Sequence, residues 1–196
     1  QWTKPTKWYR QLFLIGGAQQ QYNFDGDLTD RQGQLFGYIQ PLNYWNIQGF
    51  WIHRPDVFDD RLTRGGPVVR RPGINFWSGS VSTDSRKDIV LDFSADLGCT
   101  SEGFCSRSAG LGVQLRPAPN IQLRVGPSWG HDETGAQYVQ TVTDSFATAF
   151  YGRRYVFAEV MQSSIGMDTR FNVTFSPNLT FELFVQPLLA SADYSR

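Results

Sequence analysis

Four arginines fall in one irregular stretch of the chain, residues 55–73. Prolines and glycines interrupt this stretch, so it is predicted to be a loop rather than a strand. A guanidinium presents a planar fork of donors that matches a carboxylate, a phosphate or a sugar acid. The candidate ligand-binding residues are therefore Arg61, Arg64, Arg70 and Arg71. The alternative is that Asp56, Asp59 and Asp60 pair with these arginines and that the loop folds inward as a plug.

The two histidines, His53 and His131, raise the question of hydrolytic chemistry. A hydrolase of this kind needs a serine, a histidine and a carboxylate or amide within hydrogen-bonding reach. Ser78 or Ser128 could supply the hydroxyl, but neither lies in a local motif such as a nucleophile elbow. We therefore expect ordinary histidines at strand ends and no enzymatic activity. The histidine and cysteine spacing matches no zinc site, so no metal or cofactor is expected.

Cys99 and Cys105 lie at the two ends of a short polar segment. Such a pair suits a disulfide in an oxidising compartment. The alternative is two free thiols in a cytosolic loop. Because two cysteines cannot complete a structural zinc site alone, the disulfide is the expected arrangement.

The elements that position these residues are predicted to be long strands. Residues 165–175 and 179–189 each alternate between apolar and polar side chains, which is the pattern of a strand with two different faces. Pro177-Asn178 between them indicates a hairpin turn. Each run is about eleven residues long, whereas an ordinary globular strand has roughly five or six. Roughly nine to eleven tilted residues cross a bilayer as a β-strand.

The same alternation recurs upstream, in residues 89–97, 109–116 and 121–129. Short turns are expected near residues 42, 85, 118 and 177, and long loops at 55–73, 99–107 and 131–159. Within the last region, 138–143 and 154–157 are expected to be strand ends around a loop. This alternation of short turns and long loops is typical of up-and-down outer-membrane barrels. No segment has helical periodicity, so the chain is predicted to be all-β, with about eight to ten antiparallel strands in a single domain over residues 1–196.

The composition limits the function classes. Charged residues make up 18% of the chain and aromatic residues 15%, against roughly 25% charged in an average soluble domain. The formal net charge is zero, so no bulk attraction to nucleic acid is expected. No apolar run reaches the roughly 20 residues of a transmembrane helix.

Alternation alone does not say which face meets lipid. A soluble, lipocalin-like barrel directs its apolar face inward, and a membrane barrel directs it outward. The long strands, the aromatic residues near strand ends and the mixed charges on the polar face favour a transmembrane β-barrel. The alternative is that these rings form the core of a soluble sandwich. The polar residues expected to face the lumen are Asp92, Asp96, Arg116, Arg124, Asp168, Arg170 and Glu182.

Several short segments, in this order, resemble an uncharacterised family of bacterial outer-membrane β-barrel proteins whose members carry an N-terminal family-9-like carbohydrate-binding module. The segments are residues 43–46, 59–67, 82–86, 136–139, 151–157 and 175–179. The resemblance covers residues 22–194 and implies the C-terminal part of the barrel and a location in the bacterial outer membrane. The sugar-binding module is absent from this chain, which ends at Arg196 without a terminal aromatic residue, so an incomplete barrel is expected.

Two functions are compatible with this sequence. The first is a pore or transport component for small or oligomeric solutes, with carbohydrate as a candidate solute of the full-length protein. The second is a membrane-anchored surface or binding scaffold whose lumen is plugged. Both place the chain in a lipid bilayer and neither involves nucleic acid. The strand number of the complete protein and the free width of its lumen would separate them.

Overall fold

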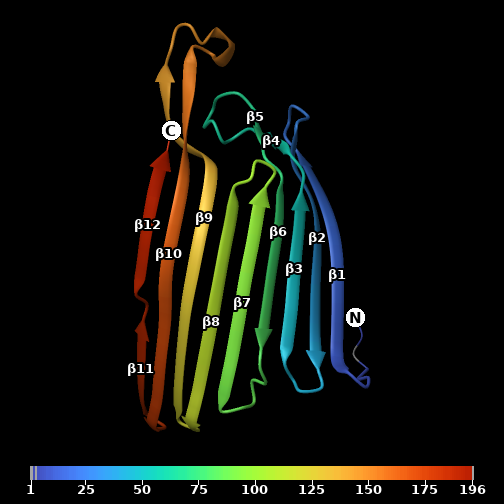
Figure 1. Ribbon diagram of the computed structural model, residues 1–196, viewed down its shortest axis with the longest axis vertical. Helices are drawn as coiled ribbons and strands as arrows, with labels where there is room; N and C mark the ends of the chain where they lie inside the picture. Colours follow the sequence, from blue (N-terminus) through green and yellow to red (C-terminus); the bar gives the residue numbers. More distant parts are fainter. Residues whose placement is uncertain (1, 3, 196) are drawn as a thin grey trace.

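The computed structural model describes residue 2 and residues 4–195, and most of these residues belong to one antiparallel sheet (Figure 1). Neighbours in this ten-stranded sheet are also neighbours along the chain, apart from one excursion between the third and fourth strands. The prediction of an all-β, antiparallel chain is therefore confirmed. The strands of the sheet are β1 (Tyr9–Tyr22), β2 (Leu28–Pro41), β3 (Asn46–Arg54), β6 (Ile74–Ser82), β7 (Ile89–Thr100), β8 (Cys105–Ala118), β9 (Ile121–Thr143), β10 (Arg153–Ser176), β11 (Leu179–Val185) and β12 (Leu188–Ser195).

The excursion and the last strand pair are the irregular parts of this order. Strands β4 (Val57–Asp59) and β5 (Val69–Arg71) pair only with each other. Both lie within residues 55–73, here called the arginine-rich loop. Strands β11 and β12 both pair with β10 and form one edge that is interrupted before Pro187. Proline lacks an N–H to donate to a ladder, which accounts for the break at an edge position.

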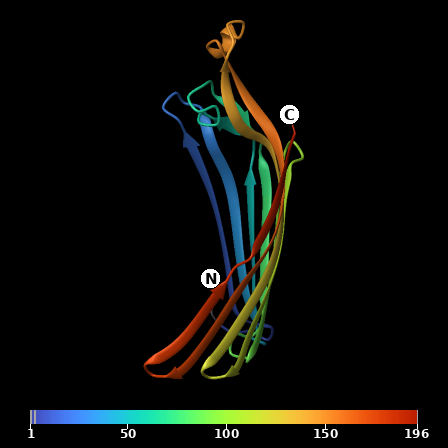
Figure 2. The same cartoon turned by 90° about the vertical axis from the view of Figure 1, so that its left-hand side faces the viewer.

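The sheet is curved and open (Figure 2). Within the described residues, β11 and β12 have no strand on their outer side, and β1 has only the isolated bridge between Trp2 and Leu12. The sheet therefore does not close on itself as a barrel.

The short turns lie at 42–45, 83–88, 119–120 and 177–178, close to the positions predicted from the sequence. Figure 1 shows all four at one end of the sheet, opposite the arginine-rich loop. In the first of them the Asn43 side chain accepts a hydrogen bond from the backbone N–H of Trp45 (3.2 Å), and Tyr44 adopts a φ of 65°. Asparagine and proline favour such turns because they supply local acceptors and a fixed φ.

Two of the expected long loops are wrong in extent. The strand ends predicted at 138–143 and 154–157 are confirmed, but residues 131–137, 153 and 158–159 are strand as well. Strands β9 and β10 are 23 and 24 residues long, and the connection between them is only 144–152, with a short 3₁₀ helix, η1 (Thr148–Phe150). The predicted 99–107 loop shrinks to residues 101–104. Two register shifts between β9 and β10, at 156/157 and 158/160, place extra residues in β9 and interrupt its alternation.

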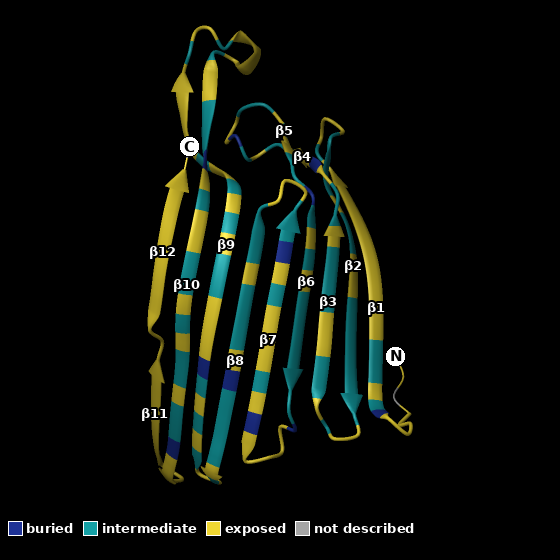
Figure 3. Cartoon of the chain, viewed as in Figure 1, coloured by how far each residue is buried: buried dark blue, intermediate teal, exposed yellow. Residues whose placement is uncertain are grey.

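Few residues of this sheet are buried (Figure 3). The buried apolar residues are Tyr9, Val57, Val90, Ala158 and Val173. One face of β7 to β11 carries cross-strand rows such as Ile89, Leu115, Leu123, Phe171 and Leu183. Ile89 is 60% exposed and Ile165 is 62% exposed on this apolar face. A single sheet has nothing of its own with which to cover such a face.

The structure joins Cys99 and Cys105 by a disulfide between residues that lie directly opposite each other on β7 and β8. Their Cα atoms are 4.2 Å apart. The bridge closes the 101–104 turn at the same end of the sheet as the arginine-rich loop (Figure 1).

We expect the non-reduced, denatured protein to show no thiol that reacts with an alkylating reagent, because both sulfurs are in this bridge. The loop it closes is short, so Cys99→Ser with Cys105→Ser should lower the free energy of unfolding by less than about 3 kcal/mol, the value for a loop of roughly 15 residues. Two readily alkylated thiols before reduction would contradict the bridge.

Candidate functional site

The polar residues expected to line a lumen all lie on one face of the sheet, here called the polar face. Residues that pair directly across strands share a face, and the registers place them in successive rows. One row runs through Asp92, Gly112, Gly126 and Asp168, and the next through Gln114, Arg124 and Arg170. Asp96 pairs with Ser108, and Glu182 pairs with Asn172. Arg116 lies on the same side, two residues from Gln114.

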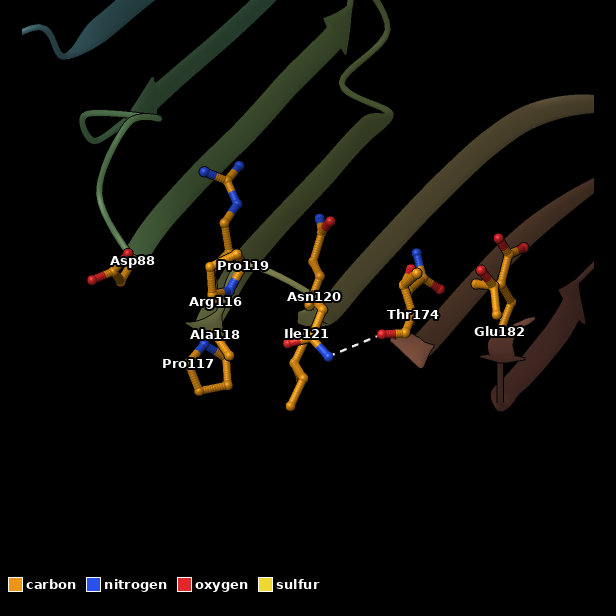
Figure 4. Close-up of a pocket in the computed structure, with 12 residues that line it drawn as sticks. Asp88, Arg116, Pro117, Ala118, Pro119, Asn120, Ile121, Thr174 and Glu182 are labelled. Carbon is orange, nitrogen blue, oxygen red and sulfur yellow. Dashed lines mark hydrogen bonds between the residues drawn. The ribbon is translucent and has the colours of Figure 1, made fainter. Parts of the chain in front are cut away.

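Three cavities hollow the polar face between β6 and β11, with volumes of about 570, 440 and 430 Å³. The largest lies at the short-turn end of the sheet. Figure 4 shows Arg116 and Glu182 on its two sides, and the Asn120 side chain donating to the backbone oxygen of Thr174 (2.9 Å). The polar face is therefore hollowed by open cavities rather than covered by a packed layer.

Arg124 lies between two carboxylates. Its guanidinium is 3.9 Å from Asp92 and 4.0 Å from Asp168. Glycines occupy the row positions between these acids, and a Cβ on Gly126 would come within 2.3 Å of an Asp168 carboxylate oxygen. Gly126 therefore makes room for Asp168 to lie across the strand, beside Arg124.

Arg170 lies directly opposite Arg124 and next to Phe184. Its guanidinium carbon is 4.9 Å from the centroid of the Phe184 ring. In the amide orientation that satisfies its neighbours, the Gln114 side-chain oxygen accepts hydrogen bonds from Arg116 and Gln122. Arginine and amide N–H groups are therefore concentrated in this part of the polar face.

The polar face changes character towards β1. Its row through Ser78 and Asp96 continues into Phe50, Phe36 and Ile15. The rings of Phe13 and Phe36 lie 6.0 Å apart between centroids. One side of this face therefore offers charges and amides, and the other offers aromatic and aliphatic groups.

The arginine-rich loop does not bring its four arginines together. Arg70 pairs with Asp56, Arg71 lies 3.7 Å from Asp59, and Arg61 lies 3.8 Å from Asp60. Arg64 lies over the ring of Tyr138 on β9, 4.5 Å from its centroid. These are the acid–arginine pairs of the alternative interpretation, in which the arginines stabilise the loop itself.

Asp56 anchors the base of the loop. Its carboxylate accepts hydrogen bonds from Arg70 Nε (3.1 Å), from the Gly73 N–H (2.6 Å) and from the Ser101 hydroxyl (2.8 Å). These donors, Arg70 first, lower the pKa of Asp56 from 3.8 to about 2. The loop base is therefore tied both to itself and to the β7–β8 turn.

We expect the ¹³C chemical shift of the Asp56 carboxyl carbon to titrate with a midpoint near pH 2. A carboxylate whose pKa is depressed in the folded state stabilises the fold at a pH above its unfolded pKa, which is 3.8 for Asp56. That stabilisation is lost as the pH falls through the folded-state pKa of about 2. The loop base should accordingly remain closed at pH 5. A midpoint at the unfolded value would mean that the three donors do not hold the carboxylate.

The tip of the loop reaches across the sheet. A Cβ on Gly66 would lie within 2.2 Å of the ring of Tyr155 on β10, so the loop backbone rests directly on that ring. Thr63, whose side chain donates to the Pro67 carbonyl (2.9 Å), is 1% exposed. The loop, here called the strap, is therefore compact. Its base connects β3 to β6, and its tip rests on β9 and β10.

The histidines are placed differently. His53 bonds to the Asn75 side chain (2.8 Å) and stacks on Trp51. His131 Nδ1 lies 2.9 Å from the hydroxyl of Ser163, and its Nε2 lies 3.3 Å from Glu133. The sequence analysis singled out neither Ser163 nor Glu133. Only the β9–β10 register brings Ser163 to His131. Glu133 lies two residues from His131 on the same strand, so alternation is the signal that could have placed it on the same face.

In this serine–histidine–glutamate arrangement, the backbone of Ser163 is not free to supply an oxyanion site. Ser163 pairs with His131 on one side and with Ser191 on the other, so its backbone is inside the ladder. Stabilisation of a tetrahedral intermediate needs N–H donors that are free to face it. No three His, Cys, Asp or Glu side chains converge as a metal site in the described part of the chain.

Comparison of the chain with protein-family models, with curated proteins and with solved structures finds no match. Among the residues that the structure describes, no helix is long and apolar enough to cross a membrane.

Proposed function

We propose that the chain forms the C-terminal portion of a transmembrane β-barrel of the bacterial outer membrane and acts as a pore or transport component for small or oligomeric solutes. The observation that carries this proposal is the pair of contrasting faces on long antiparallel strands. The apolar face meets lipid and the polar face lines a water-filled lumen. The resemblance to the outer-membrane family with a carbohydrate-binding module supports the same location, and carbohydrate is a candidate solute.

The exposed apolar face supports a lipid environment. Large side chains along it, including Phe93 at 53% exposed, would meet water in a soluble monomer. Burial of apolar surface is worth about 25 cal/mol per Å², and exposed apolar patches above a few hundred Å² mark interaction or membrane surfaces. Bilayer contact covers such a face without a second layer of protein.

Closure of the barrel needs further strands. All neighbouring pairs are antiparallel, and β1 and β11 occupy the first and ninth places in the strand order, so the two edges run in the same direction. Joining them directly would create a parallel seam. An odd number of additional strands keeps every pair antiparallel, as in bacterial single-chain barrels with even strand numbers.

The strap favours a second candidate function, a membrane-anchored scaffold with a filled lumen. Its tip contacts Tyr138 and Tyr155 after crossing from β3 and β6. A loop in this position narrows the end of the lumen. The two candidates differ in one measurable property, the ion conductance of the full-length protein.

We expect the full-length protein to sediment with membranes and to need detergent for extraction, because its apolar face must be covered. Reconstituted in planar bilayers, a pore gives discrete conductance steps, whereas a plugged scaffold gives none. A full-length protein that stays monomeric in buffer without detergent would contradict the membrane proposal itself.

A further inference from the structure

We propose that Arg124 and Arg170 form a binding site for an oxyanion group, a carboxylate or a phosphate, on a solute that reaches the polar face. The inference rests on the proposed function in one respect, namely that this face meets water. It adds a solute class to the lumen, since the site selects acidic groups. The arginine-rich strap, where the sequence first suggested anion binding, is not this site.

Two like charges lie directly opposite each other at this site. Arg124 and Arg170 are direct cross-strand partners on β9 and β10. Directly opposite like charges destabilise a strand pair, and their Cβ atoms are about 4.5–5.5 Å apart. An oxyanion between the two guanidiniums removes this repulsion and gains a bond from each side.

Neither guanidinium is saturated by its neighbours. Arg124 lies 3.9 and 4.0 Å from its two carboxylates, whereas charge-assisted hydrogen bonds are about 2.7–2.9 Å long. Arg170 forms no ion pair with any described residue, and its guanidinium carbon lies 4.9 Å from the centroid of the Phe184 ring. Donor capacity for a ligand is therefore available on both side chains.

There is space around the pair, and other donors line it. A cavity of about 440 Å³ lies over the two arginines. Its lining comprises Gln114, Gln122, Arg124, Asp168, Arg170 and Asn172. The three amides can donate to oxygens or to the hydroxyl groups of an attached sugar. The two carboxylates near the pair, Asp92 and Asp168, both lie beside Arg124, so Arg170 is the arginine with more donor capacity left for an anion.

The test is titration of the purified full-length protein, in detergent micelles at fixed ionic strength, with inorganic phosphate and separately with acetate. We expect saturable phosphate binding by calorimetry or ³¹P line broadening. Arg170→Gln should weaken it by about tenfold or more, as expected for loss of a charge-assisted hydrogen-bonded pair. Arg61→Gln, the same charge change on the strap, should leave the affinity unchanged. A response to acetate as well extends the site to carboxylates.

Arg170→Gln is the decisive variant because Arg170 holds no ion pair, so its loss leaves no unpaired acid and the fold should persist. Arg124→Gln tests the second half of the site and should weaken binding similarly. Absence of saturable binding to the wild-type chain, or an equal loss in Arg61→Gln, would overturn the site. Neither result bears on the membrane proposal, which depends on sedimentation and extraction.

Discussion

Leu183→Arg should impair assembly in the membrane much more than Glu182→Arg, although the two residues are adjacent in β11. Leu183 pairs with Phe171 on the apolar face, whereas Glu182 pairs with Asn172 on the polar face. An arginine on the lipid face of a barrel costs up to roughly 2–4 kcal/mol at the bilayer midplane, and changes on the lumen side are mild. The fraction of folded protein after insertion into lipid vesicles measures this difference.

A soluble barrel would also be damaged by Leu183→Arg, so a spin label at each position provides the control. Leu183 is 43% exposed in the isolated sheet. In the proposed barrel, a label at 183 is relaxed by lipid-soluble oxygen and a label at 182 by a water-soluble reagent. Burial of position 183 from both reagents would mean that the apolar face is an interior core and that the lipid assignment is wrong.

The strands that the sequence predicted well are those with uninterrupted alternation. Residues 165–175 and 179–185 form the hairpin of β10 and β11, with Phe171 and Val173 on one face and Arg170 and Asn172 on the other. Side-chain alternation with a period of two identifies both the strand and its two faces, so both can be predicted without knowing which distant residues pair with the strand. The edge segment 188–195 continues the hairpin beyond the break at Pro187.

The parts of β9 and β10 that lie towards their connection were predicted only in part. Residues 131–143 of β9 are rich in threonine and glutamine, and two register shifts interrupt their alternation. Backbone pairing with a long neighbour sustains these strands, and a pattern within one strand does not report such pairing. The strand ends at 138–143 and 154–157 were therefore recognised, while residues 131–137, which were expected to be loop, are also strand.

The candidate site was predictable in part. Alternation alone is enough to place Asp92, Arg124 and Asp168 on one face, but only the register shows that Arg124 lies opposite Arg170. In the arginine-rich loop, closeness in the sequence did not predict closeness in space. Its arginines are close in sequence, yet they bind separate carboxylates or an aromatic ring, because a folded loop spreads consecutive side chains in different directions.

Gly66→Ala should release the tip of the strap from the sheet. The added Cβ would lie 2.2–2.4 Å from atoms of the Tyr155 ring, so either the ring or the loop must move. Overpacking of this kind typically costs about 1–3 kcal/mol. Local opening raises the rate of tryptic cleavage after Arg61 or Arg64 about tenfold for each 1.4 kcal/mol. If the full-length protein conducts ions, its conductance should rise in the same variant, because in the proposed barrel the strap narrows the end of the lumen.

Two comparisons isolate the contact with Tyr155. Gly33→Ala makes the same change in β2, where no atom lies within 4 Å of the new Cβ, and should leave the cleavage rate unaltered. In a Tyr155→Ala background the ring is gone, so adding Gly66→Ala should change the cleavage rate little beyond the effect of Tyr155→Ala alone. Such non-additivity is expected of residues in direct contact. An equal effect of Gly66→Ala in both backgrounds would show that the strap is held by its base at Asp56 and by Arg64, and that the Tyr155 ring does not fix its tip.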